Sequence, residues 1–460
     1  MPKIALSMIV RDSAATLRAC LESVRGVADE IVIADTGSTD NTVAIAREFG
    51  ARTIEIPWEN DFAGARNHAL AEVQADWVLM LDADEVLDPG AAAVIPRLVS
   101  DPNIAGYQVT IRNYVDSLEN RIWDRPAVPN DSALPAAKIF PAYIDHENVR
   151  LSRRDPRIYF VGRVHESVGS RIEGCGLHLG RAPFLIHHFG MVADEETKYR
   201  KNLFYRDLGR LKVTEMPRDA QAHLELGLVE LDNLGRAEEA LASFERACEL
   251  NPRLGVAWFF AGVTHFRLGK YQRSLRCLKQ AEKCGSTTSA VAETIGDAHY
   301  NLGEFAKAVR RYEQAAKLAP DSHSLESKLG LAIVRTGRIE DGLEQIRHAL
   351  TQRPHLAELH DRLILCLTWL GRTSEAAVAA EGKLRAGKNL TSGDFARSAS
   401  LWAKLGDWAR ATAVLHVGLQ IYRDDATLKE GLEQLAAHAG PQVGELASTL
   451  SGEGLRISEH

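Results

Sequence analysis

The stretch Trp77-Val78-Leu79-Met80-Leu81-Asp82-Ala83-Asp84-Glu85 joins five apolar residues directly to a group of three acids. Five apolar residues are too few to span a membrane, and with polar neighbours on both sides they predict a buried strand of a parallel sheet. Ligands bind at the carboxyl ends of strands in open α/β sheets, and carboxylates at positions i and i+2 can share a divalent cation and its attached phosphates. The stretch therefore predicts a metal–phosphate site, with an acidic turn before a helix as the alternative interpretation.

Alternating strands and helices are predicted around this stretch. Strands are expected at residues 3–10, 30–34, 52–56 and 76–81, and helices at residues 17–24, 43–49 and 62–73. Strands and helices that alternate at short spacing predict a parallel sheet with right-handed crossovers. Residues 3–100 are therefore expected to form an α/β fold of a nucleotide-binding type.

Two loops at the predicted carboxyl edge carry further candidate residues. Residues 35–40 read Asp-Thr-Gly-Ser-Thr-Asp, in which Gly37 permits a sharp turn and the last two residues can cap the next helix. Capping does not account for Asp35, which could accept hydrogen bonds from a base or a ribose. In residues 61–67, Arg66 offers a planar guanidinium that suits a diphosphate, with a solvated helix arginine as the alternative.

Four motifs in this order resemble the family 2 glycosyltransferases, which have a GT-A fold. They are Ser7-Met8-Ile9-Val10-Arg11-Asp12, Asp35-Thr36-Gly37-Ser38-Thr39-Asp40, Ala65-Arg66-Asn67 and Leu81-Asp82-Ala83-Asp84-Glu85. The chain departs from the family at Arg11-Asp12, where many relatives carry Lys-Asn-Glu.

The resemblance implies a fold, a donor and a set of binding residues. It implies a Rossmann-like GT-A domain with a mostly parallel sheet over residues 1–210, and a nucleotide-sugar donor, with a UDP-sugar as first choice. It further implies that Asp35 contacts the base, that Arg66 lies near the base or diphosphate, and that Asp82 and Asp84 hold the ribose–diphosphate and a Mg²⁺ or Mn²⁺ ion. The expected nucleotide-sugar-binding residues are Val10, Asp12, Asp35, Gly37, Arg66, Asp82 and Ala83.

The acceptor side is expected in residues 101–200, where prolines at 126, 129, 135, 141 and 156 should break long elements and strand-like pieces fall at 105–111 and 157–161. An inverting transferase needs a carboxylate that takes the proton of the acceptor, and Glu166 beside His165 is the candidate base. Asp131 and Glu147 are the other candidates for the general base. An exposed acid at a strand end is the alternative role for Glu166.

A second candidate segment reads Ile186-His187-His188-Phe189-Gly190. His188 resembles the late histidine with which the family completes its metal or diphosphate site, since neutral imidazole can ligate a metal. His187 is the alternative ligand, and a buried structural histidine is the other possibility. Lys198, Arg200 and Lys201 follow on a predicted helix, where they could meet the diphosphate when a lid closes or form a solvated face.

Composition excludes several classes of protein. The formal net charge is −7 with Lys and Arg scattered along the chain, which favours neither nucleic acid nor an anionic membrane as partner. The six cysteines form no CxxC pair and no set with zinc spacing, so we expect reduced, mostly buried thiols. No window approaches ~18 consecutive apolar residues, and the N-terminus runs straight into a strand, so a soluble cytoplasmic protein without a transmembrane segment is expected.

Glycines recur at a fixed interval in the C-terminal half. Gly235, Gly269, Gly303, Gly337 and Gly371 are each 34 residues apart, and Gly406 follows after 35. Small residues stand five positions after each glycine, at Ala240, Ser274, Ala308, Gly342, Ala376 and Ala411, where facing helices must approach closely. This is the pattern of the tetratricopeptide repeat, whose helix pairs bury their apolar faces against neighbouring pairs. An all-α solenoid of about six helix pairs is expected over residues 218–440, with a tail at 441–460.

Together these features predict an inverting, metal-dependent glycosyltransferase of hexosyltransferase type, whose repeats present a protein or peptide acceptor. GT-A domains joined to such repeats resemble bacterial enzymes that glycosylate flagellin-type proteins or ribosomal peptides. Similar domains without repeats extend lipopolysaccharide cores, which is the first alternative. A non-enzymatic repeat scaffold with a decayed transferase domain and a nucleotidyltransferase are the others, and the repeats could also serve for homodimerisation.

Overall fold

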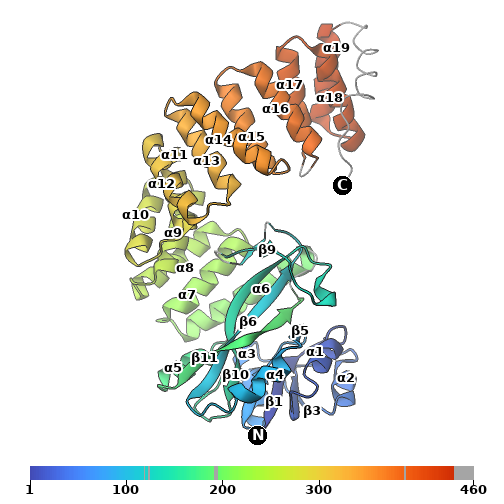
Figure 1. Ribbon diagram of the computed structural model, residues 1–460, viewed down its shortest axis with the longest axis vertical. Coiled ribbons are helices and arrows are strands. Elements are labelled where there is room, and N and C mark those ends of the chain that lie inside the picture. The colour runs from blue at the N-terminus through green and yellow to red at the C-terminus, as the bar shows by residue number, and fades with distance from the viewer. Residues whose placement is uncertain (119, 123–124, 191–194, 388–389, 440–460) are drawn as a thin grey trace. The chain divides into compact units, whose positions relative to one another are not determined.

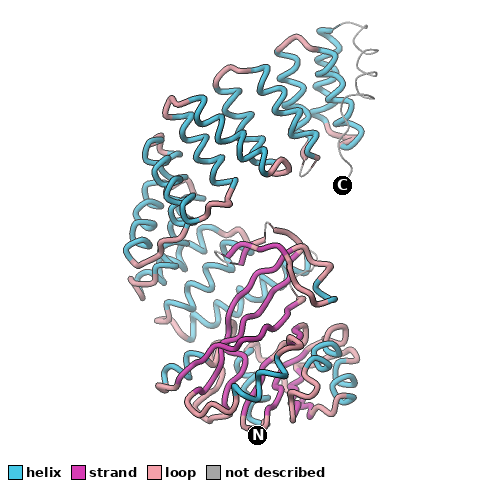
Figure 2. The backbone as a smooth tube through the Cα atoms, viewed as in Figure 1, coloured by secondary structure: helices cyan, strands magenta, loops and turns pink. Residues whose placement is uncertain are grey.

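The computed structural model describes residues 1–118, 120–122, 125–190, 195–387 and 390–439. The chain divides into two compact units, of which the first is Met1–Pro252 and the second begins at Arg253. Within the described residues all strands belong to the first unit, and the second unit is built from helices (Figures 1 and 2).

A nine-stranded sheet forms the centre of the first unit. In spatial order its strands are β3 (Arg52–Glu55), β2 (Glu30–Asp35), β1 (Ile4–Val10), β4 (Trp77–Met80), β10 (Ala142–Arg153), β6 (Ile104–Val115), β11 (His178–His188) and β5 (Glu85–Leu87), and β9 (Val128–Pro129) pairs with β10. A separate pair is formed by β7 (Arg121–Ile122) and β8 (Arg125–Pro126).

The strand directions refine the predicted fold. The first four strands in spatial order are parallel as predicted, but β10 runs antiparallel to both β4 and β6, and β5 runs antiparallel to β11. A parallel return from β6 to β10 would need a crossover helix, and the described residues between them hold only short strands and the 3₁₀ turn η1 (Pro135–Ala137). The predicted α/β domain is therefore confirmed, with a mixed sheet rather than a mostly parallel one.

Helices α1 (Leu17–Ser23), α2 (Thr42–Glu48) and α3 (Phe62–Glu72) connect the parallel strands and lie within two residues of their predicted bounds. The short helices α4 (Ala91–Leu98) and α5 (Gly169–Gly174) follow later in the unit. The sheet is buried on both faces, because successive residues of β1 contribute to different clusters: Leu6 and Met8 pack with α1, whereas Ala5 packs with the residues of α3.

Long strands in the acceptor half were not predicted. The strands β6 and β10 are twelve residues long and β11 is eleven. Pro141 and Pro156 fall outside β10, so the prolines bound this strand rather than break it, and the register of β11 shifts between Arg181 and Leu185, around Pro183. The expected strand at 157–161 is wrong, because these residues form a loop with one isolated bridge, Val161 to Ser167.

Four helical segments complete the first unit. They are α6 (Glu195–Glu215), α7 (Ala220–Leu228), the π-helical turn η2 (Val229–Asn233) and α8 (Ala237–Leu250). The predicted boundary between the two domains lay at residues 210–218, whereas the compact unit continues to Pro252 and so includes the pair α7 and α8.

The second unit consists of helix pairs followed by a single helix. The pairs are α9 (Gly255–Arg267) with α10 (Tyr271–Lys283), α11 (Ser289–Asn301) with α12 (Phe305–Leu318), α13 (His323–Arg335) with α14 (Ile339–Gln352), α15 (Ala357–Trp369) with α16 (Thr373–Ala386), and α17 (Ser392–Lys404) with α18 (Trp408–Ile421), and α19 (Ala426–Ala439) follows. The six periodic glycines all have positive φ, between 65° and 94°, just after the first helix of a pair, where a residue with a side chain is strained. The small residues five positions later are all buried, as the repeat pattern predicts.

Residues 440–460, which include the predicted tail, lie outside the described residues. In the described part of the chain, no helix combines the length and the apolar character that crossing a membrane requires. None of the six cysteines forms a disulfide; Cys20, Cys248 and Cys366 are buried and the other three are half-buried.

Candidate active site

Asp82 and Asp84 lie in the turn between β4 and β5, and Glu85 is the first residue of β5. The amide of Glu85 donates to the carbonyl of Asp82 at 3.0 Å, and the amide of Asp82 donates to Oε2 of Glu85 at 2.8 Å. The turn sends the side chains of Asp82 and Asp84 to different partners, because Asp82 contacts an arginine of β10 and Asp84 contacts a histidine at the end of β11.

Two arginines hold the carboxylate of Asp82. Nη2 of Arg66, from α3, lies 2.5 Å from its Oδ1, and Nη2 of Arg150, from β10, lies 3.2 Å from its Oδ2. Arg150 also binds Oε1 of Glu85 at 2.7 Å. Burial alone would raise the pKa of Asp82, but the two guanidinium groups hold that pKa far below its usual range, whereas burial raises the pKa of Glu85 to about 7. Asp82 is thus an ionised acid with both oxygens engaged.

Arg66 also brings Glu166 to this site. Nε of Arg66 donates to Oε1 of Glu166 at 2.5 Å, although the two residues are 100 positions apart. The side chain of Glu166 is only 13% exposed, so it is not the exposed strand-end acid that was the alternative. One guanidinium therefore links the predicted base to the acids at the end of β4.

A tyrosine from α6 lies beside the same acids. The ring of Tyr205 stacks on those of Phe62 and His165, with centroids 6.1 and 6.2 Å apart. Burial first, and then the negative charges of Glu166, Asp82 and Asp84, raise the pKa of Tyr205 to about 12. Of the three predicted lid cations, Lys201 lies over the Tyr205 ring at 5.9 Å, whereas Arg200 is exposed and pairs with Glu196 on its own helix.

Asp84 and His188 form the pair that could hold a metal ion. Nε2 of His188 lies 3.3 Å from Oδ2 of Asp84, and Nδ1 of His188 lies 2.8 Å from Oδ1 of Asn113. Because Nδ2 of Asn113 donates to the carbonyl of Ile144 at 2.9 Å, its Oδ1 is left to accept a hydrogen bond from Nδ1–H of His188. In the neutral imidazole this arrangement leaves the lone pair on Nε2, facing Asp84, which is the tautomer that a metal ligand needs.

The space around this pair fits a cation. A Cβ atom on Gly190 would lie 1.8 Å from Oδ2 of Asp84 and 2.8 Å from Nε2 of His188, so only glycine leaves the two ligand atoms clear. Asp82 does not join them in this arrangement, because arginines occupy both of its oxygens. The described residues contain no group of three or more His, Cys, Asp or Glu side chains placed to hold a metal. A divalent ion would therefore take two protein ligands and complete its coordination with phosphate oxygens.

His187, the alternative ligand, points elsewhere. It is 3% exposed, its Nδ1 lies 2.9 Å from the hydroxyl of Tyr114, and its Nε2 lies 3.3 Å from Oδ2 of Asp88. Burial lowers the pKa of His187, whereas the hydrogen bond and charge of Asp84 outweigh burial and raise the pKa of His188. These contacts favour a structural role for His187 and leave His188 as the candidate ligand.

The loops after β1 and β2 bind each other at the same edge of the sheet. Oδ1 of Asp12 accepts from the amide of Thr39 at 2.7 Å, and the hydroxyl of Ser38 accepts from the amide of Asp12 at 2.9 Å. The carboxylate of Asp35 is 3% exposed and accepts hydrogen bonds from the amides of Gly37 and Ser38 and from the Ser38 hydroxyl. In this structure Asp35 therefore shapes its own loop, and its contact with a base stays a prediction.

The other predicted residues lie as follows. Val10 ends β1 and is buried, its carbonyl accepting the amide of Thr36 at 3.0 Å, and Ala83 is a largely buried residue of the acidic turn. Asp131 is 77% exposed and pairs with Arg112, and Glu147 pairs with Arg181. Neither substitute base shares the Arg66 contact that Glu166 makes.

Sequence reasoning missed Arg150, Glu85, Asn113 and Tyr205. Glu85 stood in the quoted acidic motif and could have been weighed as a partner for an arginine. Arg150 and Asn113 come from the strands β10 and β6, and Tyr205 comes from the helix α6. No local sequence pattern indicated that these elements lie beside β4, so only the fold brings the three residues to the acids.

Two family models match parts of the chain. Residues 7–156 match the family model described as glycosyl transferase family 2, and residues 206–254 and 294–381 match the model described as tetratricopeptide repeat. A TPR repeat-containing protein of Synechococcus elongatus is 43% identical over 109 residues, which are 24% of this chain and 27% of that protein.

Two further relatives carry glycosyltransferase names. A glycosyltransferase of Rickettsia felis is 39% identical over 87 residues, covering 19% of this chain and 30% of that protein. The lipopolysaccharide core biosynthesis glycosyltransferase LpsC of Rhizobium meliloti is 35% identical over 122 residues, covering 25% of this chain and 44% of that protein. The chain thus spans less than half the length of each of these relatives.

Proposed function

We propose that this chain transfers a sugar from a nucleotide donor to a protein or peptide, because residues 7–156 match the family model described as glycosyl transferase family 2 and residues 206–254 and 294–381 match the tetratricopeptide repeat model. The observation that carries the proposal is the cluster of Asp82, Arg66 and Glu166, in which one guanidinium joins the acid after β4 to the predicted base. The donor is a nucleotide sugar, with a UDP-sugar as first choice.

The donor would lie along the carboxyl edge of the parallel strands. The interlocked loops of Asp12 and Asp35 frame the base, and the acidic turn at Ala83 faces the ribose and diphosphate. Arg66 is charged and only 8% exposed, so its guanidinium is already dehydrated. A nearby diphosphate would therefore bind it without displacing much water.

A divalent cation, Mg²⁺ or Mn²⁺, is part of the proposal. Asp84 and His188 would hold it, and Asn113 would keep His188 in the tautomer that binds. When bound, such an ion neutralises charge on the leaving diphosphate.

Glu166 would act as the general base. Arg66 engages its Oε1, and Oε2 would take the proton from the acceptor atom as that atom bonds to the anomeric carbon. The bond from this carbon to the diphosphate oxygen breaks in the same step, so the nucleoside diphosphate leaves and the configuration at the anomeric carbon inverts. His165, the residue before Glu166, stacks its ring on that of Tyr205.

The repeats support a protein or peptide acceptor, since arrays of helix pairs form extended binding surfaces. A lipopolysaccharide acceptor is the second candidate, and it is favoured by the similarity to LpsC over residues of the catalytic domain. Location in the cytoplasm and dimer formation stay predictions.

A thermal-shift panel tests the donor proposal. UDP-, GDP- and dTDP-sugars are added to the full chain with and without Mn²⁺, because a ligand that binds only the folded state raises its melting temperature. We expect the largest rise with a UDP-sugar and Mn²⁺ together. No rise with any sugar nucleotide would contradict the proposed function.

A further inference from the structure

The loop that carries Glu166 turns back on itself between two bonded residues. The amide of Val161 donates to the carbonyl of Ser167 at 3.2 Å, and the amide of Ser167 donates to the carbonyl of Val161 at 3.3 Å. Within the loop, Gly162 has a φ of 96° and His165 a φ of 53°. A non-glycine residue at positive φ is strained, so the conformation of His165 needs support from outside the loop.

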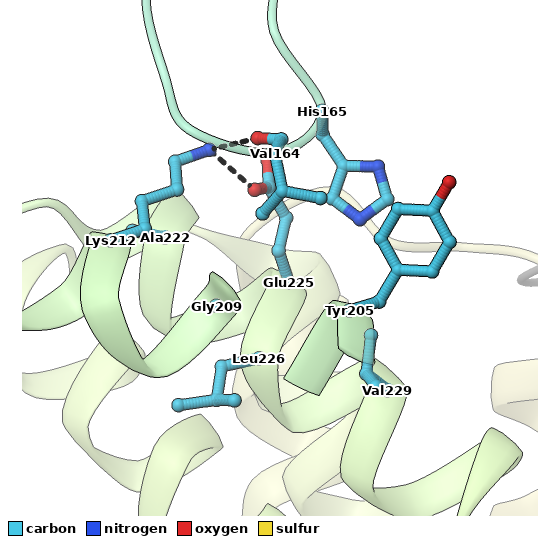
Figure 3. A pocket seen from close by; sticks show the side chains of 9 residues that line it. All are labelled: Val164, His165, Tyr205, Gly209, Lys212, Ala222, Glu225, Leu226 and Val229. Carbon is cyan, nitrogen blue, oxygen red and sulfur yellow. Dashed lines mark hydrogen bonds and ion pairs between the residues drawn. The ribbon is translucent and has the colours of Figure 1, made fainter. Parts of the chain in front are cut away.

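A buried lysine of α6 gives this support. Nζ of Lys212 donates to the carbonyl of Val164 at 3.0 Å and binds Oε2 of Glu225, on α7, at 2.7 Å (Figure 3). Lys212 is 6% exposed, and its Nζ would lie 3.2 Å from a Cβ on Gly162, so it fills the space under the loop. Figure 3 also shows the rings of His165 and Tyr205 facing each other beside these contacts.

A second ion pair holds the loop from the same helix. Arg163 donates to both carboxylate oxygens of Glu215, at 2.7 Å from Nε and 2.6 Å from Nη2. The carbonyl of Arg163 accepts the amide of Phe62, the first residue of α3, at 3.0 Å. The loop is therefore held between α3, which carries Arg66, and the helices α6 and α7.

We propose that Lys212, within the first match to the tetratricopeptide repeat, is a positioning residue that holds the Val164–Glu166 loop through its simultaneous bonds to Val164 and Glu225. The proposal rests on the proposed function for the role of Glu166. It makes the first repeat part of the catalytic unit, which agrees with the extent of that unit to Pro252.

The effect on the reaction follows from geometry. Lys212 binds the carbonyl of Val164, two residues before Glu166, and Arg66 binds the carboxylate of the Glu166 side chain. If the carbonyl is released, the loop gains freedom while Arg66 stays in place, so Oε2 no longer points reliably at the acceptor. A displacement of about 1 Å at a reacting group can lower the rate by about 100-fold.

The test replaces Lys212 by methionine in the full chain, which keeps the length of the side chain and removes its charge. We expect kcat for UDP release from UDP-glucose to fall about 10- to 100-fold, with the Kd for UDP and Mn²⁺ unchanged by calorimetry. Lys212→Arg, which keeps a charged donor, should retain most of the activity.

Stability and positioning are separated by two further variants. Lys212→Met leaves Glu225, which is 12% exposed, with a hydrogen bond from Gln221 but without its cation. The double variant Lys212→Met/Glu225→Met replaces the pair by apolar side chains and should recover the melting temperature. The double variant should not recover kcat, because the carbonyl of Val164 still lacks its donor. Lys383→Met is the matched control, since Lys383 is also 6% exposed and binds two acceptors, Asp361 and Asp394, in the second unit.

Hydrogen exchange of the free protein gives a readout that does not depend on sugar transfer. The amides of Val161 and Ser167 should exchange faster in Lys212→Met and at the wild-type rate in Lys383→Met. If the wild type releases no UDP from UDP-glucose, the proposed function is weakened and the exchange measurement alone decides whether Lys212 holds the loop. Unchanged exchange, recovery of kcat in the double variant, or an equal loss of kcat in Lys383→Met would overturn the proposal.

Discussion

Asp82 and Asp84 are two positions apart and have different surroundings. The two side chains are similarly exposed, 37% for Asp82 and 34% for Asp84, but Asp82 is bound by two arginines whereas Asp84 faces His188. Guanidinium groups at hydrogen-bond distance favour the ionised form of a carboxylate, and both oxygens of Asp82 have such a partner. Asp84 forms no ion pair with either arginine, so it is the acid that is left to bind a metal and its phosphates.

The first residue-scale prediction concerns Asp84. We expect Asp84→Ala to abolish the Mn²⁺-dependent part of UDP binding while the melting temperature stays near that of the wild type, because Asp84 makes no buried ion pair. Calorimetry with and without Mn²⁺ measures this, with Glu48→Ala, an exposed acid of α2 paired with Arg18, as the control. Unchanged Mn²⁺-dependent affinity in Asp84→Ala would remove the metal assignment.

The second concerns Glu166. Glu166→Gln keeps an oxygen that accepts from Nε of Arg66 but cannot take a proton, so donor binding should persist while transfer falls by about 10²–10⁴-fold. Steady-state kinetics beside calorimetry separates the two effects. Glu147→Gln and Asp131→Asn serve as comparisons, and the base would be reassigned if one of them lost transfer while Glu166→Gln kept it.

At the scale of elements, each helix start in the repeats needs partners for its free amides. At the start of α17, Asp394 and Thr391 form a capping box, in which Asp394 Oδ2 accepts the Thr391 amide at 2.9 Å. Oδ1 of the same carboxylate binds Nζ of Lys383, from α16, at 2.7 Å. One buried acid thus joins a helix cap to the packing between neighbouring pairs.

This acid makes the stability of the second unit depend on pH. Burial would raise the pKa of Asp394, but the hydrogen bonds from Lys383 and Thr391 outweigh burial and lower that pKa. A lowered pKa in the folded state means that the stabilisation is present above about pH 4 and is lost as the pH falls through the folded-state pKa.

We therefore expect Asp394→Asn to lower the stability of the second unit by about 1–3 kcal/mol at pH 7 and by less below pH 3. Thermal unfolding of the full chain as a function of pH, followed by circular dichroism, measures this. Asp424→Asn, at an exposed acid that pairs with Lys429, should change little at any pH. Equal losses at pH 7 and in acid would argue against the ion pair as the cause.

At the scale of the whole chain, the residue at which a shortened protein ends determines which contacts of the Glu166 loop it keeps. A chain that ends at Asp207 loses Lys212, Glu215 and Glu225, and with them both ion pairs and the contact to Val164. A chain that ends at Pro252 keeps the whole first unit.

We expect residues 1–252 to fold, to bind UDP and Mn²⁺ as the full chain does, and to lose transfer to a protein acceptor through a raised KM. A docking surface raises the local concentration of the acceptor without changing the chemistry, so kcat for donor hydrolysis should persist. Residues 1–207 should lose that hydrolysis as well.

Kinetics on the three chains, with light scattering after size-exclusion chromatography, tests these expectations. If residues 1–252 modify the acceptor as efficiently as the full chain, the second unit does not dock it. Light scattering would then decide whether that unit joins two copies of the chain.

The amino-acid sequence alone determined the order of elements over residues 3–100 and the repeats of the C-terminal half, because both follow from local patterns. The apolar run before Asp82 marks a buried strand, and the 34-residue glycine interval marks the positions where positive φ ends a helix. The buried strand β4 and the positive φ of the six glycines confirm those predictions.

The tertiary structure alone decided which side chains meet at the acids. Arg150 reaches Glu85 across 65 positions, Asn113 reaches His188 across 75, and Glu166 reaches Arg66 across 100. These contacts depend on β10 and β11 entering the sheet beside β4 and β6, and on α6 packing under the Glu166 loop. No periodicity encodes such pairings, because a strand or helix pattern specifies which face of an element is buried but not which element covers it.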